Sequence, residues 1–127
     1  MKYLILLLVF SINAYSESFY LVCDGIEDQR ISDEKNLIKK SVGIKVTDSS
    51  LNYDDTSYGT SSNSFYKKTD LKITFNKTIY INEKIESFVQ GDIDRISGNI
   101  SLSHNNFITN YSYFFDGKCK TSQEKAF

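Results

Sequence analysis

Apolar and polar residues alternate with a period of two along most of the chain after residue 18, and this period is typical of half-buried β-strands. The clearest run lies near the end, where aromatic residues, a glycine and a cysteine share one parity: Tyr111, Tyr113, Phe115, Gly117 and Cys119. Near the start, Phe19, Leu21 and Cys23 are in phase in the same way. Both cysteines therefore lie on the apolar faces of their strands, as a buried bridge between the first and last strands requires.

Three inner runs predict further strands. Residues 42–46 alternate cleanly, and residues 71–81 keep one apolar parity, which predicts either one long strand or a hairpin turning at Asn76-Lys77. Residues 96–102 also share a face, and the glycine at position 98 indicates a bulge or a close backbone approach. His104-Asn105-Asn106 predicts the turn into the final strand, so that residues 98–103 form a hairpin with residues 111–121.

Two stretches lack this alternation. Residues 24–40 are mostly polar, and we expect a mobile loop or one short helix there. Residues 48–70 are dense in Ser, Asp, Asn and Thr, which favours a long hairpin tip or a surface loop. With about seven or eight short strands, the chain is predicted to fold as an all-β antiparallel barrel or sandwich, and the absence of a linker or repeat indicates one domain over residues 17–127.

The N-terminus has the features of an export signal. Lys2 precedes an apolar stretch over residues 3–10, which is too short to span a bilayer, and Ala14-Tyr15-Ser16 supplies small residues before a cut at Glu17. An uncleaved N-terminal anchor is the alternative. We expect residues 1–16 to be a signal peptide, and the mature protein to lie in the periplasm or outside the cell without crossing the membrane.

Composition narrows the possible partners and fixes the possible disulfide. The 127 residues carry 15 basic and 16 acidic side chains, so the chain has no basic field that would favour nucleic acid. Cys23 and Cys119 are the only cysteines, and an exported chain with two cysteines has one possible intramolecular bridge. A redox pair would need a C-x-x-C spacing, and a zinc site would need more ligands than this chain offers.

Candidate chemistry centres on two carboxylates. Asp92 and Asp94 lie two positions apart, so on a strand they would face the same way and could act as an acid–base pair or bind a cation. We favour instead a structural ion pair between Asp94 and Arg95 at a strand bend. His104 is the only histidine and is expected to be a solvated turn residue, while Asp54-Asp55 suits a hairpin turn better than a calcium loop. No catalytic residue, cofactor or metal site is predicted.

Aromatic residues make up 14% of the chain, more than we expect one small core to hold. Some of them should be exposed or line a cleft, and such a surface suits a ligand or a glycan. Tyrosine also tolerates the surface of strands without a function. The predicted binding surface consists of Tyr53, Tyr58, Phe65, Tyr66 and Phe107.

Spaced landmarks give the chain a resemblance to a class of short exported bacterial proteins. The landmarks are Phe19-Tyr20-Leu21-Val22-Cys23, Ile93-Asp94-Arg95-Ile96-Ser97-Gly98, Gly117-Lys118-Cys119 and Phe127, about a quarter of the chain. This likeness implies export and carries no activity with it. Cys23-Asp24-Gly25 also resembles the turn after the first strand of periplasmic C-type lysozyme inhibitors, which are disulfide-closed β-barrels. Their Ser-Gly-x-x-Tyr loop is not matched, since this chain has Tyr58-Gly59-Thr60.

These observations favour a small exported binding protein without enzymatic activity, whose partner is either a small apolar ligand or another protein. Three alternatives remain open: an inhibitor of the lysozyme-inhibitor type, a small hydrolase that uses Asp92 and Asp94, and a structural subunit of the envelope. A buried carboxylate with a raised pKa would favour the hydrolase. An exposed, unpaired strand edge would favour the structural subunit.

Overall fold

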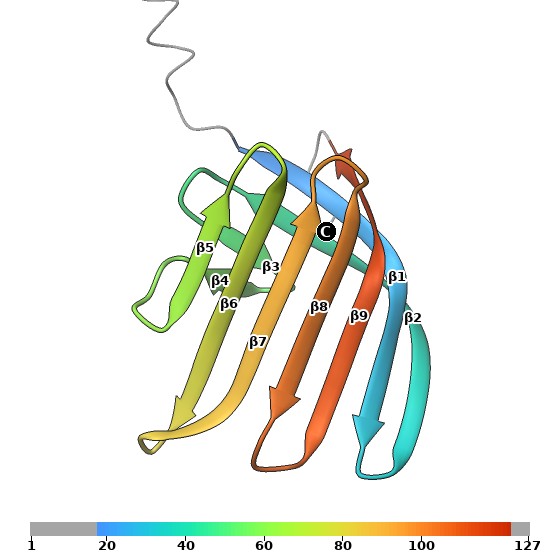
Figure 1. Ribbon diagram of the computed structural model, residues 1–127, viewed down its shortest axis with the longest axis vertical. Coiled ribbons are helices and arrows are strands. Elements are labelled where there is room, and N and C mark those ends of the chain that lie inside the picture. Colours follow the sequence, from blue (N-terminus) through green and yellow to red (C-terminus); the bar gives the residue numbers. More distant parts are fainter. Residues whose placement is uncertain (1–17, 123–127) are drawn as a thin grey trace, which may run out of the picture.

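The computed structural model describes residues 18–122, which form one antiparallel sheet of nine strands curled into a nearly closed barrel (Figure 1). The strands are β1 (Phe19–Ile31), β2 (Glu34–Val46), β3 (Leu51–Tyr53), β4 (Thr56–Tyr58), β5 (Ser64–Lys68), β6 (Lys72–Ile81), β7 (Lys84–Asp94), β8 (Asn99–Asn106) and β9 (Tyr111–Ser122). Their order in the sheet is β4-β3-β2-β1-β9-β8-β7-β6-β5. The predicted all-β barrel is confirmed, with one or two strands more than expected. The predicted signal peptide lies outside the described residues.

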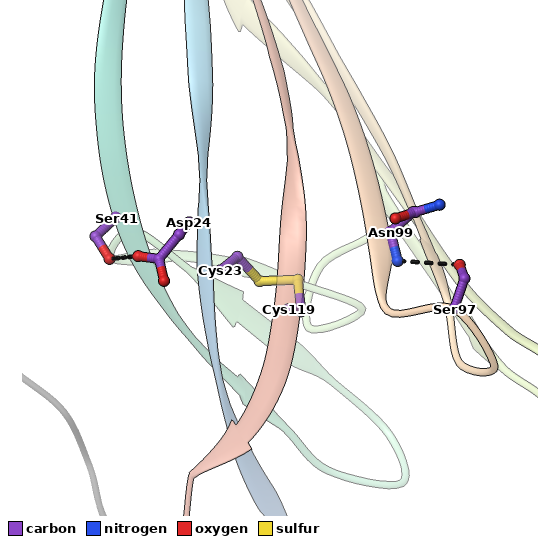
Figure 2. Close-up of a disulfide and its surroundings, with 6 residues drawn as sticks. All are labelled: Cys23, Asp24, Ser41, Ser97, Asn99 and Cys119. Atoms are coloured by element: carbon purple, nitrogen blue, oxygen red, sulfur yellow. Dashed lines mark hydrogen bonds between the residues drawn. A yellow bond between two sulfur atoms is a disulfide. The ribbon is translucent and has the colours of Figure 1, made fainter.

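The first and last strands of the chain are neighbours and carry the disulfide. Strand β1 pairs with β9 from Tyr20 opposite Ser122 to Ile31 opposite Tyr111, and Cys23 lies directly opposite Cys119. Figure 2 shows the bridge between these two strands, with the Ser41 hydroxyl donating to the Asp24 carboxylate next to it. The predicted Cys23–Cys119 disulfide is therefore confirmed. Among the described residues, no helix is long and apolar enough to cross a membrane.

Contacts around β4 and β5, the outermost strands of the sheet order, bring the barrel close to closure. The Gly59 N–H donates to the Ser64 hydroxyl oxygen at 2.9 Å, and the Tyr66 hydroxyl donates to the Thr47 carbonyl at 2.7 Å. These are side-chain contacts and not a strand ladder, because among the nine described strands β4 pairs with β3 alone and β5 with β6 alone. The barrel is consequently drawn together at the end that holds β3, β4 and β5 (Figure 1).

Large apolar side chains fill the barrel from this closed end as far as the row of Phe75 and Phe115, which the strand registers place level with Glu27. Tyr58, Phe75 and Phe115 are almost completely buried, and the Tyr58 and Phe75 rings meet edge to face with their centroids 4.8 Å apart. The ring of Phe75 lies over Gly91, where an added Cβ would come within 2.3 Å of it. The alternating residues of 42–46 also point into the core, as predicted.

The first polar stretch is not a loop or a helix. Residues 24–40 belong to two 13-residue strands, β1 and β2, which are joined by a turn in which Ser32 has a φ of 56°. The alternation is hidden because Glu27 and Lys40 occupy inward positions where a core would normally hold apolar residues. The second polar stretch, residues 48–70, is likewise not one loop, since it contains β3, β4 and β5.

Of the two alternatives for residues 71–81, the single long strand is confirmed: β6 runs without a break through Asn76-Lys77, and the chain turns at Asn82-Glu83, where both residues have positive φ. The turn predicted at His104-Asn105-Asn106 is wrong in position. His104 lies within β8, and the turn follows at residues 107–110. The hairpin of β8 with β9 is confirmed, and so is the close approach at Gly98, whose carbonyl accepts from the Cys119 N–H at 2.7 Å.

Candidate functional site

The two carboxylates singled out in the sequence share the outer face of β7 and have separate structural partners. One Asp94 carboxylate oxygen accepts the backbone N–H groups of Ile96 at 2.9 Å and Ser97 at 3.0 Å. Both hydrogen bonds hold the pKa of Asp94 below its ordinary value, and the bond from the Ser97 N–H has the larger effect. Asp92 accepts from the Thr74 hydroxyl at 3.1 Å. The Asp94 carboxylate therefore fixes the turn after β7.

The predicted ion pair between Asp94 and Arg95 is not formed. The Arg95 guanidinium donates to the Thr69 carbonyl at 2.7 Å and lies 5.7 Å from the centre of the Phe19 ring. The Asp94 carboxylate is instead occupied by the turn backbone, because the chain bends sharply there and leaves two N–H groups pointing at it. Within residues 18–122, no group of three or more His, Cys, Asp or Glu side chains is placed to hold a metal ion.

The five aromatic residues predicted as a binding surface are divided by the structure. Tyr53 and Tyr58 are buried, at 3% and 2% exposure, so they belong to the core and not to a surface. Tyr66 is half-buried, and Phe65 on β5 and Phe107 after β8 are exposed. The prediction failed for Tyr53 and Tyr58 because strands of three residues are too short for their alternation to be recognised.

The inner face of the sheet carries a polar cluster that the sequence did not reveal. Glu27 is only 5% exposed, and its carboxylate accepts from the Gln29 amide at 2.8 Å and from the Lys40 ammonium at 3.2 Å. Lys40 also lies 3.5 Å from Asp54, in the turn between β3 and β4. A buried carboxylate is stabilised only by such paired charges and donors. The one feature of the sequence that indicated this cluster was Glu27, which has the same parity as the buried residues Leu21 and Cys23 of its strand.

Aromatic side chains adjoin this cluster on the same inner face. His104 and Tyr113 lie opposite each other on β8 and β9, and their rings stack with centroids 4.7 Å apart. Burial lowers the pKa of His104, and burial raises the pKa of Tyr113 to about 12. Among the buried side chains of residues 18–122, the hydroxyl groups of Tyr53 and Ser87 have no hydrogen-bond partner.

Three hairpins end at the same level of the barrel, opposite its closed end. The strand registers place Ser87, Asn106, Tyr111 and Ile31 in one row across β7, β8, β9 and β1. We call the ends of the β1–β2, β6–β7 and β8–β9 hairpins the three-hairpin end; Figure 1 shows their turns at the bottom of the view. It carries eight of the twelve large apolar side chains exposed among the described residues: Ile31, Leu37, Ile38, Tyr80, Ile81, Ile85, Phe107 and Ile108.

Comparison with known protein families, curated proteins and solved structures finds no match to this chain. The resemblances noted in the sequence therefore stay predictions. A functional proposal depends on the protein's own surfaces, of which the three-hairpin end is the most unusual in its polarity.

Proposed function

We propose that this protein is an exported binding protein without enzymatic activity, and that its three-hairpin end contacts another protein. The observation that carries the proposal is the clustering of exposed apolar side chains on three hairpins at one end. Exposed apolar residues scattered singly are normal, whereas a contiguous group of them marks an interaction site. Phe107 and Ile108, at 63% and 62% exposure, lie next to each other in one turn and are the most exposed of the eight apolar residues at the three-hairpin end.

A protein partner suits the barrel better than a small apolar ligand inside it. The barrel interior is filled by Tyr58, Phe75 and Phe115, each almost fully buried, and close-packed cores of this kind leave little space for a guest. Glu27 lies on the same inner face directly opposite Phe115, and its buried carboxylate would be costly to desolvate against an apolar molecule. Both features favour binding on the outside of the hairpins.

The contacts of Asp92 and Asp94 support a structural role for this pair. A catalytic acid is expected to be buried with a raised pKa, but the Asp94 pKa is lowered and its carboxylate is held by two backbone N–H groups. The Cys23–Cys119 disulfide supports export, since such bridges persist in oxidising compartments.

Site-specific photo-cross-linking tests the proposal. The photo-reactive amino acid benzoylphenylalanine is placed at Phe107, and in a matched control at Phe65, which is also exposed but lies on β5 near the closed end. We expect the Phe107 position to cross-link to a discrete exported protein, and unlabelled wild-type protein to compete. The double variant Phe107→Ser, Ile108→Ser should fail to compete. Equal cross-linking at both positions, or none at Phe107, would refute the proposal.

A further inference from the structure

Strand β2 has a long edge that no strand of the described chain covers. All 13 residues of β2 pair with β1, but β3 pairs with β2 only over Ile44, Lys45 and Val46. Residues 34–43 therefore have a neighbouring strand on one side alone, and Figure 1 shows the lower part of β2 as the outermost strand beside β1. A strand edge of this kind presents backbone N–H and C=O groups to any extended chain that can align with it.

Exposure along this edge is continuous. Six successive residues, 34–39, are exposed, and they include Leu37 at 61% and Ile38 at 39%. Proteins usually blunt a free edge with a short strand, a proline, a covering loop or lysine side chains, and of these the lower part of β2 has Lys35, Lys39 and Lys40. This chain contains no proline, and the β3–β4 hairpin reaches the edge only near Lys40, through the 3.5 Å contact with Asp54.

Charge on β2 disfavours a second copy of the chain as the partner of this edge. The strand carries four lysines and one glutamate, a net charge of 4 − 1 = +3. An antiparallel pairing of two β2 edges about Leu37 would place Lys35 of each copy opposite Lys39 of the other. Like charges directly opposite each other in a sheet are destabilising.

The same charges favour an acidic extended segment. On the outer face of β2, Leu37 lies between Lys35 and Lys39, both exposed. Lys35 lies 3.7 Å from Asp28, but that carboxylate also binds Arg30 at 3.1 Å, so the lysine is not fully neutralised. A strand with an acidic residue at each side of an apolar residue, spaced by two, would match this pattern.

We propose that the free edge of β2 binds an extended segment of a partner protein as an additional strand, with acidic residues opposite Lys35 and Lys39 and an apolar residue opposite Leu37. Backbone hydrogen bonds would supply affinity and the alternating side chains would supply specificity, as in other complexes formed by strand addition. The inference rests on the proposed function, because the free edge runs into the three-hairpin end and the same partner would cover both.

A synthetic peptide tests the edge directly. The probe is the fluorescently labelled, terminally blocked peptide Thr-Glu-Val-Leu-Val-Glu-Thr, and the comparison peptide has lysine in place of both glutamates. We expect the acidic peptide to bind at least about tenfold more tightly than the basic one, since two cross-strand charge pairs change sign. Amide hydrogen exchange should slow at residues 34–40 when the acidic peptide is bound. A version with N-methyl groups along its backbone should not bind.

Charge-reversal variants supply the controls. The double variant Lys35→Glu, Lys39→Glu should prefer the basic peptide, whereas Lys118→Glu, at an exposed position of β9 with a strand partner on both sides, should behave as wild type. Unchanged preference in the double variant, or binding without protection of β2, would overturn the proposal. Protection of β2 that rises with the concentration of the protein alone would also overturn it, by assigning the edge to a second copy.

The same variants separate this inference from the proposed function. If the charge-reversed protein still competes in the Phe107 cross-linking experiment, the partner binds the hairpins without using the edge, and only the strand-addition proposal fails. If the acidic peptide binds β2 but no protein cross-links at Phe107, the edge is real and the assignment of the three-hairpin end fails.

Discussion

Removal of the disulfide should destabilise the protein strongly while leaving its fold intact. The bridge joins residues separated by 96 positions, so it closes nearly the whole described chain into a loop. A loop of this size restricts the unfolded chain by about 4.7 kcal/mol at 25 °C on the chain-entropy account. Replacing the buried Cys23 by alanine adds about 1 kcal/mol for the lost packing. The double variant Cys23→Ala, Cys119→Ala should therefore lose about 5 to 6 kcal/mol of unfolding free energy.

The folded state should survive this change because the bridge is not what aligns the two strands. Strands β1 and β9 pair over twelve positions, from Tyr20 opposite Ser122 to Ile31 opposite Tyr111. The ladder and the side chains beneath it remain when the sulfurs are removed. The loss of unfolding free energy therefore arises mainly from the unfolded state, which gains conformational entropy when the cross-link is removed.

Urea unfolding followed by far-UV circular dichroism measures the effect. With a urea dependence of about 1–3 kcal/mol per M for a small domain, the midpoint should fall by about 2 to 6 M, and the slope should rise as the unfolded chain expands. The wild type in excess reductant is the matched control, because it loses the bridge but keeps both sulfurs. A loss below about 1 kcal/mol in both samples would refute the loop argument. Loss of protection in the β1–β9 amides of the folded variant would refute the account of the ladder.

Three further changes test individual contacts. Gly91→Ala would force a Cβ against the Phe75 ring and should cost about 1–3 kcal/mol in urea unfolding, whereas Gly43→Ala, on the outer face of β2, should cost far less. Tyr53→Phe removes a buried hydroxyl without a partner and should raise the thermal midpoint or leave it unchanged; a clear decrease would show that the hydroxyl is bonded. Because the Asp94 pKa is lowered in the folded state, its contribution is present above the ordinary value near 3.8 and disappears as pH falls through the folded value, so Asp94→Asn should flatten the acid-side loss of stability.

The parts of the fold that the sequence predicts well are those where alternation and burial coincide. Val42, Ile44 and Val46 face a dry core, so their period of two is visible without any structure. The cysteines gave the strongest long-range prediction, because a chain with two in-phase cysteines allows one intramolecular bridge. That bridge in turn predicts that the first and last strands are neighbours, as the structure confirms.

The missed elements share one physical cause. In the lower halves of β1 and β2, inward positions hold Glu27 and Lys40, whose charges pair with each other at 3.2 Å. A pairing between residues 13 positions apart cannot be recognised before the hairpin register is known, so the segment resembles a polar loop. His104 was also misplaced because its partner lies on another strand. A histidine beside two asparagines resembles a turn until the structure shows the Tyr113 ring stacked against it.

The polarity of the barrel changes from one end to the other, and this change connects the missed elements with the proposed function. At the closed end, apolar side chains such as Val46, Leu51 and Tyr58 point inward. Towards the three-hairpin end, the inner face carries Glu27, Gln29 and Lys40, while large apolar side chains such as Phe107 are exposed. This arrangement has two penalties for an isolated domain. Exposed apolar groups weaken its solubility, and buried charges cost desolvation free energy. A partner that covers the hairpins and the free edge of β2 would remove the first of these penalties, which is why we place binding at this end.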